Sequence, residues 1–137
     1  MSTNKTFIPS QFREKYSGLL GADFPEFLRY CTVKMPKSIW VNSLKIRPAI
    51  LAQRLQKKGW ALQPLFHENA FALEEVTRPG QAKEFWEGLF NLQEKSSMLP
   101  AIILNPQKND FVLDACAAPG NKTLQLACLV GGYGKIV

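Results

Sequence analysis

The chain has 137 residues, 46% of them hydrophobic, which suits one domain or two small ones, and no apolar run reaches the roughly 18 residues of a membrane span. The formal net charge is +6, and residues 1–60 hold eleven Lys and Arg against three Asp and Glu. This asymmetry fits a surface that contacts phosphates, although a solvated helix face explains part of it on its own.

The front half of the chain predicts a mixture of helices and strands. Two short helices are expected in residues 10–32, on either side of a break at 21–23. Residues 38–44 alternate like a strand, and Pro48 then opens a helix over 49–57 with Ile50, Leu51 and Leu55 on its apolar face. Strands at 61–66 and 70–74 flank a turn with His67, which we expect to be solvated. A helical turn at 81–86 and a strand at 89–92 follow.

The second half predicts a strand, a turn and a helix. Ser96 or Ser97 is expected to cap a helix that runs to Leu104 and ends at residues 105–106. Residues 111–113 form a short buried strand, 115–120 are small or turn-forming, and 123–130 fit a helix that ends at Gly131. Residues 135–137 begin a second parallel strand. In open α/β sheets a nucleotide-like cofactor binds at such a turn, with the helix N-terminus facing an anionic group.

The turn at residues 114–123 has three interpretations. An ordinary strand–turn–helix connection also uses small residues. The pair Lys122-Thr123 is similar to the end of a P-loop, but Asn121 separates Gly120 from Lys122 and no glycine stands at the required upstream position. The third interpretation is a methyltransferase cofactor motif, and other parts of the sequence bear on it.

Four blocks, in the right order, resemble the Sun-type RNA (cytosine-5) methyltransferases of the Nol/Nop/Sun family. They are DACAAPGNKT (114–123), which is similar to the cofactor motif, FNLQEKSSMLPAIILNP (90–106), PKSIWVNSLK (36–45) and KKGWALQPL (57–65). Asn121 stands where the family usually has Gly, and Trp40 where it usually has Arg. Because Asn tolerates a left-handed backbone, cofactor binding is still expected.

The resemblance implies an α+β RNA-recognition-like module with an N-terminal helical segment over residues 1–95. It implies that residues 96–137 are the truncated start of an α/β Rossmann-like, S-adenosylmethionine-dependent methyltransferase domain. The reaction would convert a cytosine of rRNA or tRNA to 5-methylcytosine, in the cytoplasm, or in the nucleus or nucleolus of a eukaryote. The residues implied to bind S-adenosylmethionine are Cys116, Ala117, Ala118, Pro119, Gly120, Asn121 and Lys122.

No catalytic residue is expected within the chain. Cys31, Cys116 and Cys128 match neither catalytic motif of the family, and they form no pairing or metal-ligand pattern, so free thiols and no metal are expected. The family's nucleophilic cysteine would lie beyond Val137, and the chain by itself would be inactive. A non-catalytic RNA-binding adaptor and a P-loop-like nucleotide-binding protein remain as alternatives.

Several side chains carry expectations of their own. Gln93 and Glu94 are expected to tie the two modules together by hydrogen bonds, and the three tryptophans to serve packing. Basic side chains of the front half would supply RNA affinity, among them Lys34, Lys37 and Lys45. Apolar residues of the incomplete second module would stay partly exposed, and a protease would trim the chain beyond Pro106. These residues are Val112, Leu113, Leu124, Leu126 and Ile136.

Overall fold

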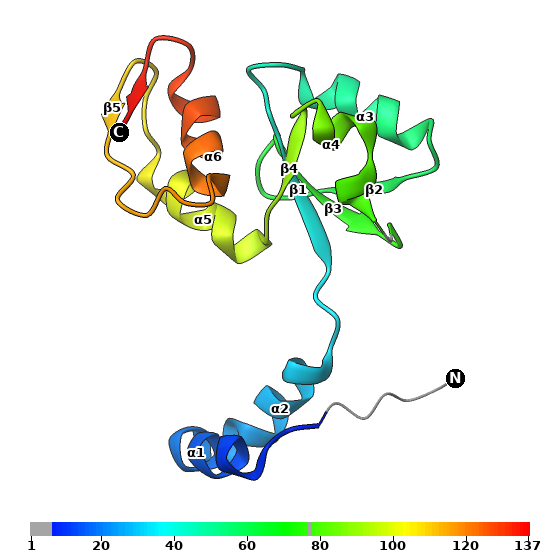
Figure 1. Cartoon of the computed structure of the whole chain (residues 1–137), viewed down its shortest axis with the longest axis vertical. Coiled ribbons are helices and arrows are strands. Elements are labelled where there is room, and N and C mark those ends of the chain that lie inside the picture. The colour runs from blue at the N-terminus through cyan, green and yellow to red at the C-terminus, as the bar shows by residue number, and fades with distance from the viewer. Residues whose placement is uncertain (1–6, 77) are drawn as a thin grey trace. The chain divides into compact units, whose positions relative to one another are not determined.

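The computed structural model describes residues 7–76 and 78–137, so residues 1–6 and 77 of the expected 1–95 module lie outside the described residues. The chain divides into two compact units, Met1–Met35 and Pro36–Val137. Each contains its own helices, and the second also contains both sheets. The mixture of helix and sheet expected from the sequence is therefore present (Figure 1).

The first unit consists of two helices separated by a short 3-10 turn. Helix α1 (Ser10–Leu20) ends where Gly21 adopts φ +51°, the turn η1 spans Gly21–Asp23, and α2 (Phe24–Thr32) follows. The rings of Phe12 and Tyr16 lie 4.4 Å apart, and those of Tyr16 and Phe27 lie 5.4 Å apart. No side chain is fully buried between residues 7 and 35. The predicted pair of helices and its break are confirmed.

The second unit is built on a four-stranded antiparallel sheet with the order β2-β3-β1-β4. Its strands are β1 (Lys37–Val41), β2 (Ala61–Pro64), β3 (Ala70–Glu74) and β4 (Phe90–Leu92). Helix α3 (Pro48–Gln56) connects β1 to β2, and the 3-10 turn η2 (Pro79–Gln81) and helix α4 (Lys83–Trp86) connect β3 to β4. The expected β-α-β-β order with a final strand is thus confirmed.

One face of this sheet packs against α3 and α4. Ile39 and Val41 of β1 join Leu51 and Leu55 of α3 and Phe90 of β4 in one buried cluster. Pro48 begins α3 because a first-turn proline lacks only an N–H that the helix does not use. Ile50, which the sequence placed on the apolar face, is instead half exposed.

The opposite face is covered by two further helices, α5 (Lys95–Leu104) and α6 (Asn121–Val130). Trp40 of β1, Ala70 of β3 and Met98 of α5 form a buried cluster, against which Cys128 and Leu129 of α6 pack. In Figure 1 the four-stranded sheet lies between α3 and α4 on one side and α5 and α6 on the other. Both faces of the sheet are therefore closed.

Hydrogen bonds of Gln93 join β4 to these helices, as the sequence predicted. Its amide nitrogen donates to the carbonyl oxygen of Ser97 and to Oε1 of Gln125, at 3.1 and 2.9 Å. Gln125 in turn donates to the carbonyl oxygen of Met98 at 2.7 Å. The same expectation is wrong for Glu94, which is exposed at the start of α5.

A second, two-stranded parallel sheet pairs β5 (Phe111–Val112) with β6 (Lys135–Ile136), and α6 runs between the two strands. Val112 and Leu126 are buried with Ala101 of α5 and Val130 of α6. The expectation that Val112 and Leu126 would be exposed is therefore wrong, because α5 supplies the covering surface. Leu113 is exposed, as expected, just after β5 ends.

Three other boundaries differ from the sequence prediction for local reasons. Strand β1 ends at Val41 because the carbonyl oxygen of Asn42 accepts turn hydrogen bonds from the N–H groups of Lys45 and Ile46. Ser96 and Ser97 lie inside α5, whose cap position is Glu94, so neither serine is the cap. Helix α6 begins at Asn121, since Gly120 occupies its cap position.

Candidate functional site

The turn from β5 to α6 is closed by the side chain of Asp114. Its Oδ1 accepts the N–H of Cys116 at 3.2 Å, and its Oδ2 accepts the hydroxyl of Thr123 at 2.7 Å. The Asp114 N–H donates to the carbonyl oxygen of Val137 at 2.6 Å, next to the parallel strand β6. Asp114 therefore fixes the strand end, the turn and the first turn of the helix relative to one another.

Gly120 gives the turn its shape. Its φ of +106° is in the left-handed region that residues with a Cβ rarely adopt, and it is the cap residue of α6. A Cβ built there meets no heavy atom within 4 Å, so the space beside this residue is open. The first turn of α6 has no acidic side chain, and its N–H groups and Lys122 give that end of the helix a positive character.

An open hollow of about 510 Å³ lies against this turn. Of the predicted cofactor-binding residues, the structure brings Ala117, Ala118, Pro119 and Gly120 together around it. Thr123, Leu124 and Ala127 of α6 complete its lining, and they are not among the residues predicted for this role. Their spacing from Gly120 by three, four and seven residues puts them on one helix face, a signal that could have found them.

The remaining predicted cofactor residues lie outside the lining. Cys116 is exposed, and its N–H is used by Asp114. Asn121 points toward the four-stranded sheet, since its Oδ1 accepts a hydrogen bond from Nδ2 of Asn91 at 3.0 Å. Lys122 is half-buried on the first turn of α6.

The basic side chains of the front half are more constrained than the sequence suggested. Nζ of Lys37 donates to the carbonyl oxygen of Val76 at 3.1 Å, and Nζ of Lys45 donates to that of Glu87 at 2.9 Å. Lys34 is exposed. Lys37 and Lys45 therefore also hold backbone segments in place, and their contribution to RNA affinity stays a prediction.

The aromatic side chains divide between packing and exposure. Trp40 is fully buried, and Trp60 packs edge-to-face on Phe90 with ring centroids 6.0 Å apart, as expected. Trp86 is 78% exposed, so the packing expectation is wrong for this residue. His67 is half-buried rather than solvated, with its ring 4.7 Å from that of Trp40, and burial lowers its pKa below the ordinary value.

Comparison with known proteins identifies the family. The family model described as the N-terminal domain of 16S rRNA methyltransferase RsmF matches residues 8–95 of this chain. The chain belongs to the RsmF family. A second model, 16S rRNA methyltransferase RsmB/F, matches residues 101–137, which contain the turn and α6. The resemblance to Sun-type methyltransferases is therefore confirmed.

Relatives named ribosomal RNA small subunit methyltransferase F extend along almost the whole chain. The protein from Vibrio parahaemolyticus is 40% identical over 139 residues, covering 96% of this chain and 29% of the relative. The protein from Aeromonas hydrophila is 35% identical over 144 residues, covering 98% of this chain and 30% of the relative. The chain thus spans about three-tenths of the length of these relatives.

Solved structures share the fold. A methyltransferase homologue from Pyrococcus horikoshii aligns with a TM-score of 0.79 and 33% identity, covering 94% of this chain and 43% of that one. NSun6 from Pyrococcus horikoshii, solved with SFG, aligns with a TM-score of 0.82 and 17% identity, covering 93% of this chain and 57% of that one. The second likeness concerns the fold alone.

Among the described residues there is no group of three or more His, Cys, Asp or Glu side chains that could hold a metal ion. In the same part of the chain, no helix is both long enough and apolar enough to cross a membrane.

Proposed function

We propose that this chain supplies the RNA-recognition-like module and the cofactor turn of an S-adenosylmethionine-dependent methyltransferase that forms 5-methylcytosine in rRNA. The observation that carries the proposal is the hollow beside Gly120, lined by small residues at the carboxyl end of a parallel strand. Family membership supports rRNA over tRNA as the substrate class, since the relatives are named for the small ribosomal subunit.

The proposed domains are residues 1–95 and 96–137. The order β2-β3-β1-β4, with α3 and α4 as crossovers, supports an RNA-recognition-like module in the first. The unit β5-α6-β6, with parallel strands joined by a helix, supports the start of a Rossmann-like domain in the second. The boundary falls where β4 passes into α5 through Gln93 and Glu94.

The residues present fit S-adenosylmethionine. Ala117, Ala118 and Gly120 leave backbone accessible because their side chains are small or absent, and a Cβ at Gly120 would project into open space. The N–H groups at the start of α6, with Lys122, would hold the carboxylate of the cofactor's methionine part. Bound there, the cofactor supplies a methyl group activated by its sulfonium. We propose the whole turn from Cys116 to Lys122 as its binding segment.

The chain's own residues bind and orient rather than carry out the chemistry. Forming 5-methylcytosine requires a thiolate that adds to C6 of the base, and a target in a stacked helix must first be flipped out. We assign that role to none of the three cysteines of this chain. Cys128 packs against the sheet, with its sulfur 3.9 Å from the carbonyl oxygen of Val41, which suits an inert thiol.

The test compares valine substitutions at two glycines of the same helix. Gly120→Val places a side chain in the hollow, whereas Gly131→Val lies at the other end of α6, where φ is +75° and a Cβ also meets nothing within 4 Å. Each substitution places a Cβ on a left-handed backbone and strains it by about 1–3 kcal/mol. A difference in cofactor affinity between the two variants therefore reflects contact of residue 120 with the ligand. The host is this chain joined to the remaining length of the Vibrio parahaemolyticus relative.

Calorimetric titration with S-adenosylmethionine should show binding lost, or weakened at least tenfold, by Gly120→Val and nearly unchanged by Gly131→Val. Methyl transfer to rRNA, measured with a radiolabelled methyl group, should fall in parallel. Equal affinity in the Gly120→Val variant and the unaltered protein would remove this turn from the cofactor site.

A further inference from the structure

Because helices cover both faces of the four-stranded sheet, RNA that binds this module must contact a surface other than a sheet face. In RNA-recognition modules, aromatic side chains on the open face of the sheet stack on bases. Here the corresponding central residue, Trp40, is fully buried, because Met98 of α5 and residues of α6 pack over it. Figure 1 shows these two helices against the sheet. A base-stacking surface on this module must therefore lie outside the sheet face.

Trp86 is the aromatic residue placed for such a contact. All three tryptophans lie in the described residues, and of these Trp86 is the exposed one, whereas tryptophan is highly buried on average. It is the last residue of α4, and Lys83, three residues earlier, lies on the same side of the helix. The Lys83 side chain is 75% exposed, which leaves its ammonium group accessible to a phosphate.

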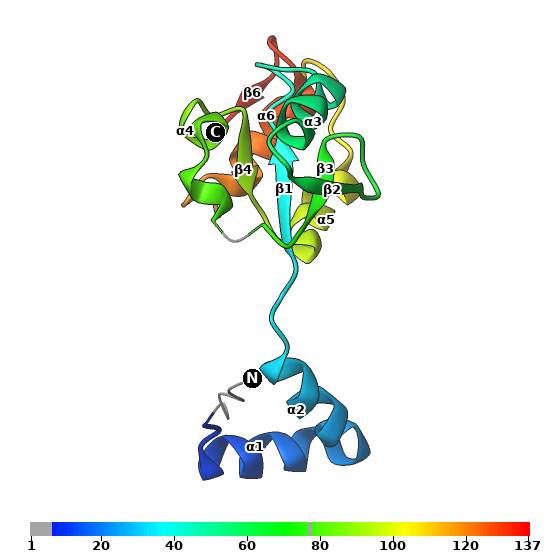
Figure 2. The same cartoon turned by 90° about the vertical axis from the view of Figure 1, so that its right-hand side faces the viewer.

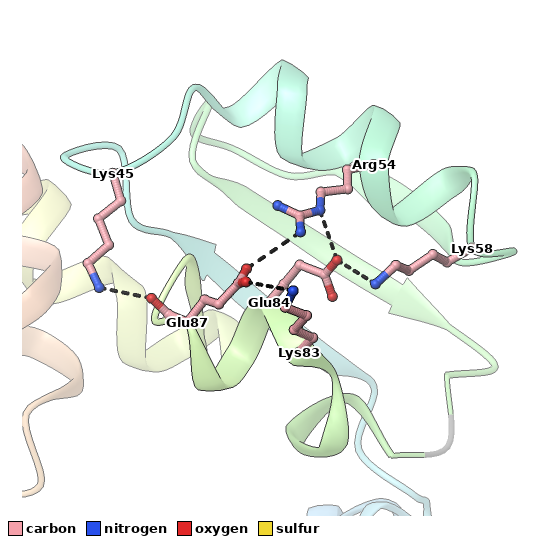
Figure 3. A network of polar contacts seen from close by, with 6 residues as sticks. All are labelled: Lys45, Arg54, Lys58, Lys83, Glu84 and Glu87. Atoms are coloured by element: carbon pink, nitrogen blue, oxygen red, sulfur yellow. Dashed lines mark hydrogen bonds and ion pairs between the residues drawn. The ribbon is translucent and has the colours of Figure 1, made fainter.

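The surroundings of α4 are positively charged and held in place, as Figure 3 shows. Nε of Arg54 and Nζ of Lys58 lie 3.0 and 2.5 Å from Oε1 of the buried Glu84. The Glu87 carboxylate lies 3.5 Å from a guanidinium nitrogen of Arg54 and 3.5 Å from Nζ of Lys83. The backbone oxygen of Glu87 accepts a hydrogen bond from Nζ of Lys45 at 2.9 Å. Three of these cations thus share two carboxylates and Lys45 bonds to a backbone oxygen, so the four cations around α4 exceed the two carboxylates by two positive charges. This charge is complementary to a phosphate backbone.

This surface belongs to the same packed unit as the cofactor turn. Gly88, two residues after Trp86, accepts a hydrogen bond from Nδ2 of Asn42 at 3.0 Å, and Oδ1 of Asn42 lies 3.7 Å from the sulfur of Cys128 in α6. Asn91 of β4 bonds to Asn121 at the start of α6. An RNA strand held at Trp86 would therefore be held at a fixed distance from the turn that we propose for the cofactor.

We propose that Trp86, with Lys83 and Lys45, forms a contact for single-stranded RNA in which the indole stacks on one base and the two ammonium groups face neighbouring phosphates. The inference rests on the proposed function, because that function implies RNA as the partner. It adds a surface that lies outside both the sheet face and the cofactor hollow.

The experiment measures the affinity of the 137-residue chain for a labelled single-stranded RNA oligonucleotide by fluorescence anisotropy, in the unaltered protein and three variants. Stacking of one base contributes about 1–3 kcal/mol, so Trp86→Ala should weaken binding about tenfold. Trp86→Phe, which keeps a ring, should stay within about threefold. Ile103→Ala is the control, because Ile103 is also 78% exposed but lies on α5. It should leave the affinity unchanged.

Two further readouts separate stacking from an effect on folding. Bound RNA should protect the tryptophan emission of the unaltered chain from quenching by acrylamide, and Trp86→Phe should abolish that protection. Lys83→Gln should lower the slope of log affinity against log salt concentration by about 0.7, the value for one phosphate contact on a single strand.

The outcomes distinguish this inference from the proposed function. If the unaltered chain binds RNA and Trp86→Ala binds it equally well, the Trp86 contact is wrong and the proposed function stands. If the unaltered chain binds no RNA, both the contact and the RNA-binding role of the module are wrong. Unchanged acrylamide quenching on RNA binding would also overturn the contact, even if Trp86→Ala were poorly folded.

Discussion

Glu84 illustrates how one side chain can organise a surface. Burial by itself raises the pKa of this carboxyl, but the hydrogen bond from Lys58 and the charges of Lys58 and Arg54 outweigh it and lower the pKa below the ordinary value of 4.5. The carboxylate therefore stays ionised inside the protein, and it ties α4 to Arg54 of α3 and to Lys58, just after the end of α3. Sequence patterns do not reveal this pairing, because 26 residues separate Lys58 from Glu84.

Replacing Lys58 by Met should destabilise the protein by about 1–2 kcal/mol at pH 7. One cation is lost from a buried carboxylate, while Arg54 remains and the half-exposed position of Lys58 limits the loss. Urea unfolding of Lys58→Met, Glu84→Gln and the double variant measures the coupling. The double variant should be more stable than the sum of the single effects predicts, and strict additivity would contradict the ion pair.

Urea unfolding at several pH values shows in which direction protonation of Glu84 changes the free energy of unfolding. Because the folded-state pKa of Glu84 is below its unfolded value, the stabilisation is present above about pH 4.5 and is lost as the pH falls through the folded-state pKa. Glu84→Gln should flatten this acid-side loss. An equally steep loss in that variant would assign it to other carboxyl groups.

At the scale of elements, α5 determines which surface of the four-stranded sheet stays accessible. The apolar residues within its sequence KSSMLPAIIL do not form a clear stripe along one face of the helix. The helix packs against two buried clusters, through Met98 on the four-stranded sheet and through Ala101 on β5 and α6. The sequence predicted the helix and its end near Asn105, which adopts a left-handed φ of 48°. It did not predict which surface the helix would cover.

Met98→Ala should cost about 2–5 kcal/mol, since Met98 is fully buried between α5 and the sheet. Leu99→Ala on the same helix is the matched control, and it should cost less than about 1 kcal/mol because Leu99 is 41% exposed. Urea unfolding measures both values. Because Met98 covers Trp40, its removal should also shift tryptophan emission to longer wavelength; equal costs for the two substitutions would contradict the packing.

At the scale of the whole chain, the N-terminal helices form a compact unit of their own inside the proposed domain of residues 1–95. Residues 33–36 have no regular structure and are exposed, and they include the boundary between Met1–Met35 and Pro36–Val137. The expected weak point beyond Pro106 is instead part of the second unit, where Val112, Leu126 and Val130 are buried. Figure 2 shows the segment that leads from α2 to β1.

Limited digestion with trypsin should therefore cut first after Lys34, which is exposed, and leave residues 35–137 as the resistant product. Lys37, three residues later, should be slower, since it lies in β1 and bonds to Val76. Mass spectrometry identifies the products. Early loss of residues beyond Pro106 would show that α6 and the parallel strands open more readily than their burial indicates.

The sequence by itself determined the local structures. Apolar spacing and the turn-forming residues Pro48 and Gly131 predicted most helices and strands, because periodicity and backbone preference act within a few residues. The motif at 114–123 pointed to the family, and the second, parallel strand was foreseen.

Tertiary structure decided which of these surfaces remain accessible. Trp40 and Trp86 are the same residue type, but α5 and α6 cover the first, while the second is 78% exposed. The packing partners of Trp40 lie up to 89 residues away along the chain, at Leu129, and no pattern within a short window encodes such a distance. Asp114 joins Thr123, and Gln93 joins Gln125, for the same reason: hydrogen bonds between separate elements form only after packing has brought those elements together.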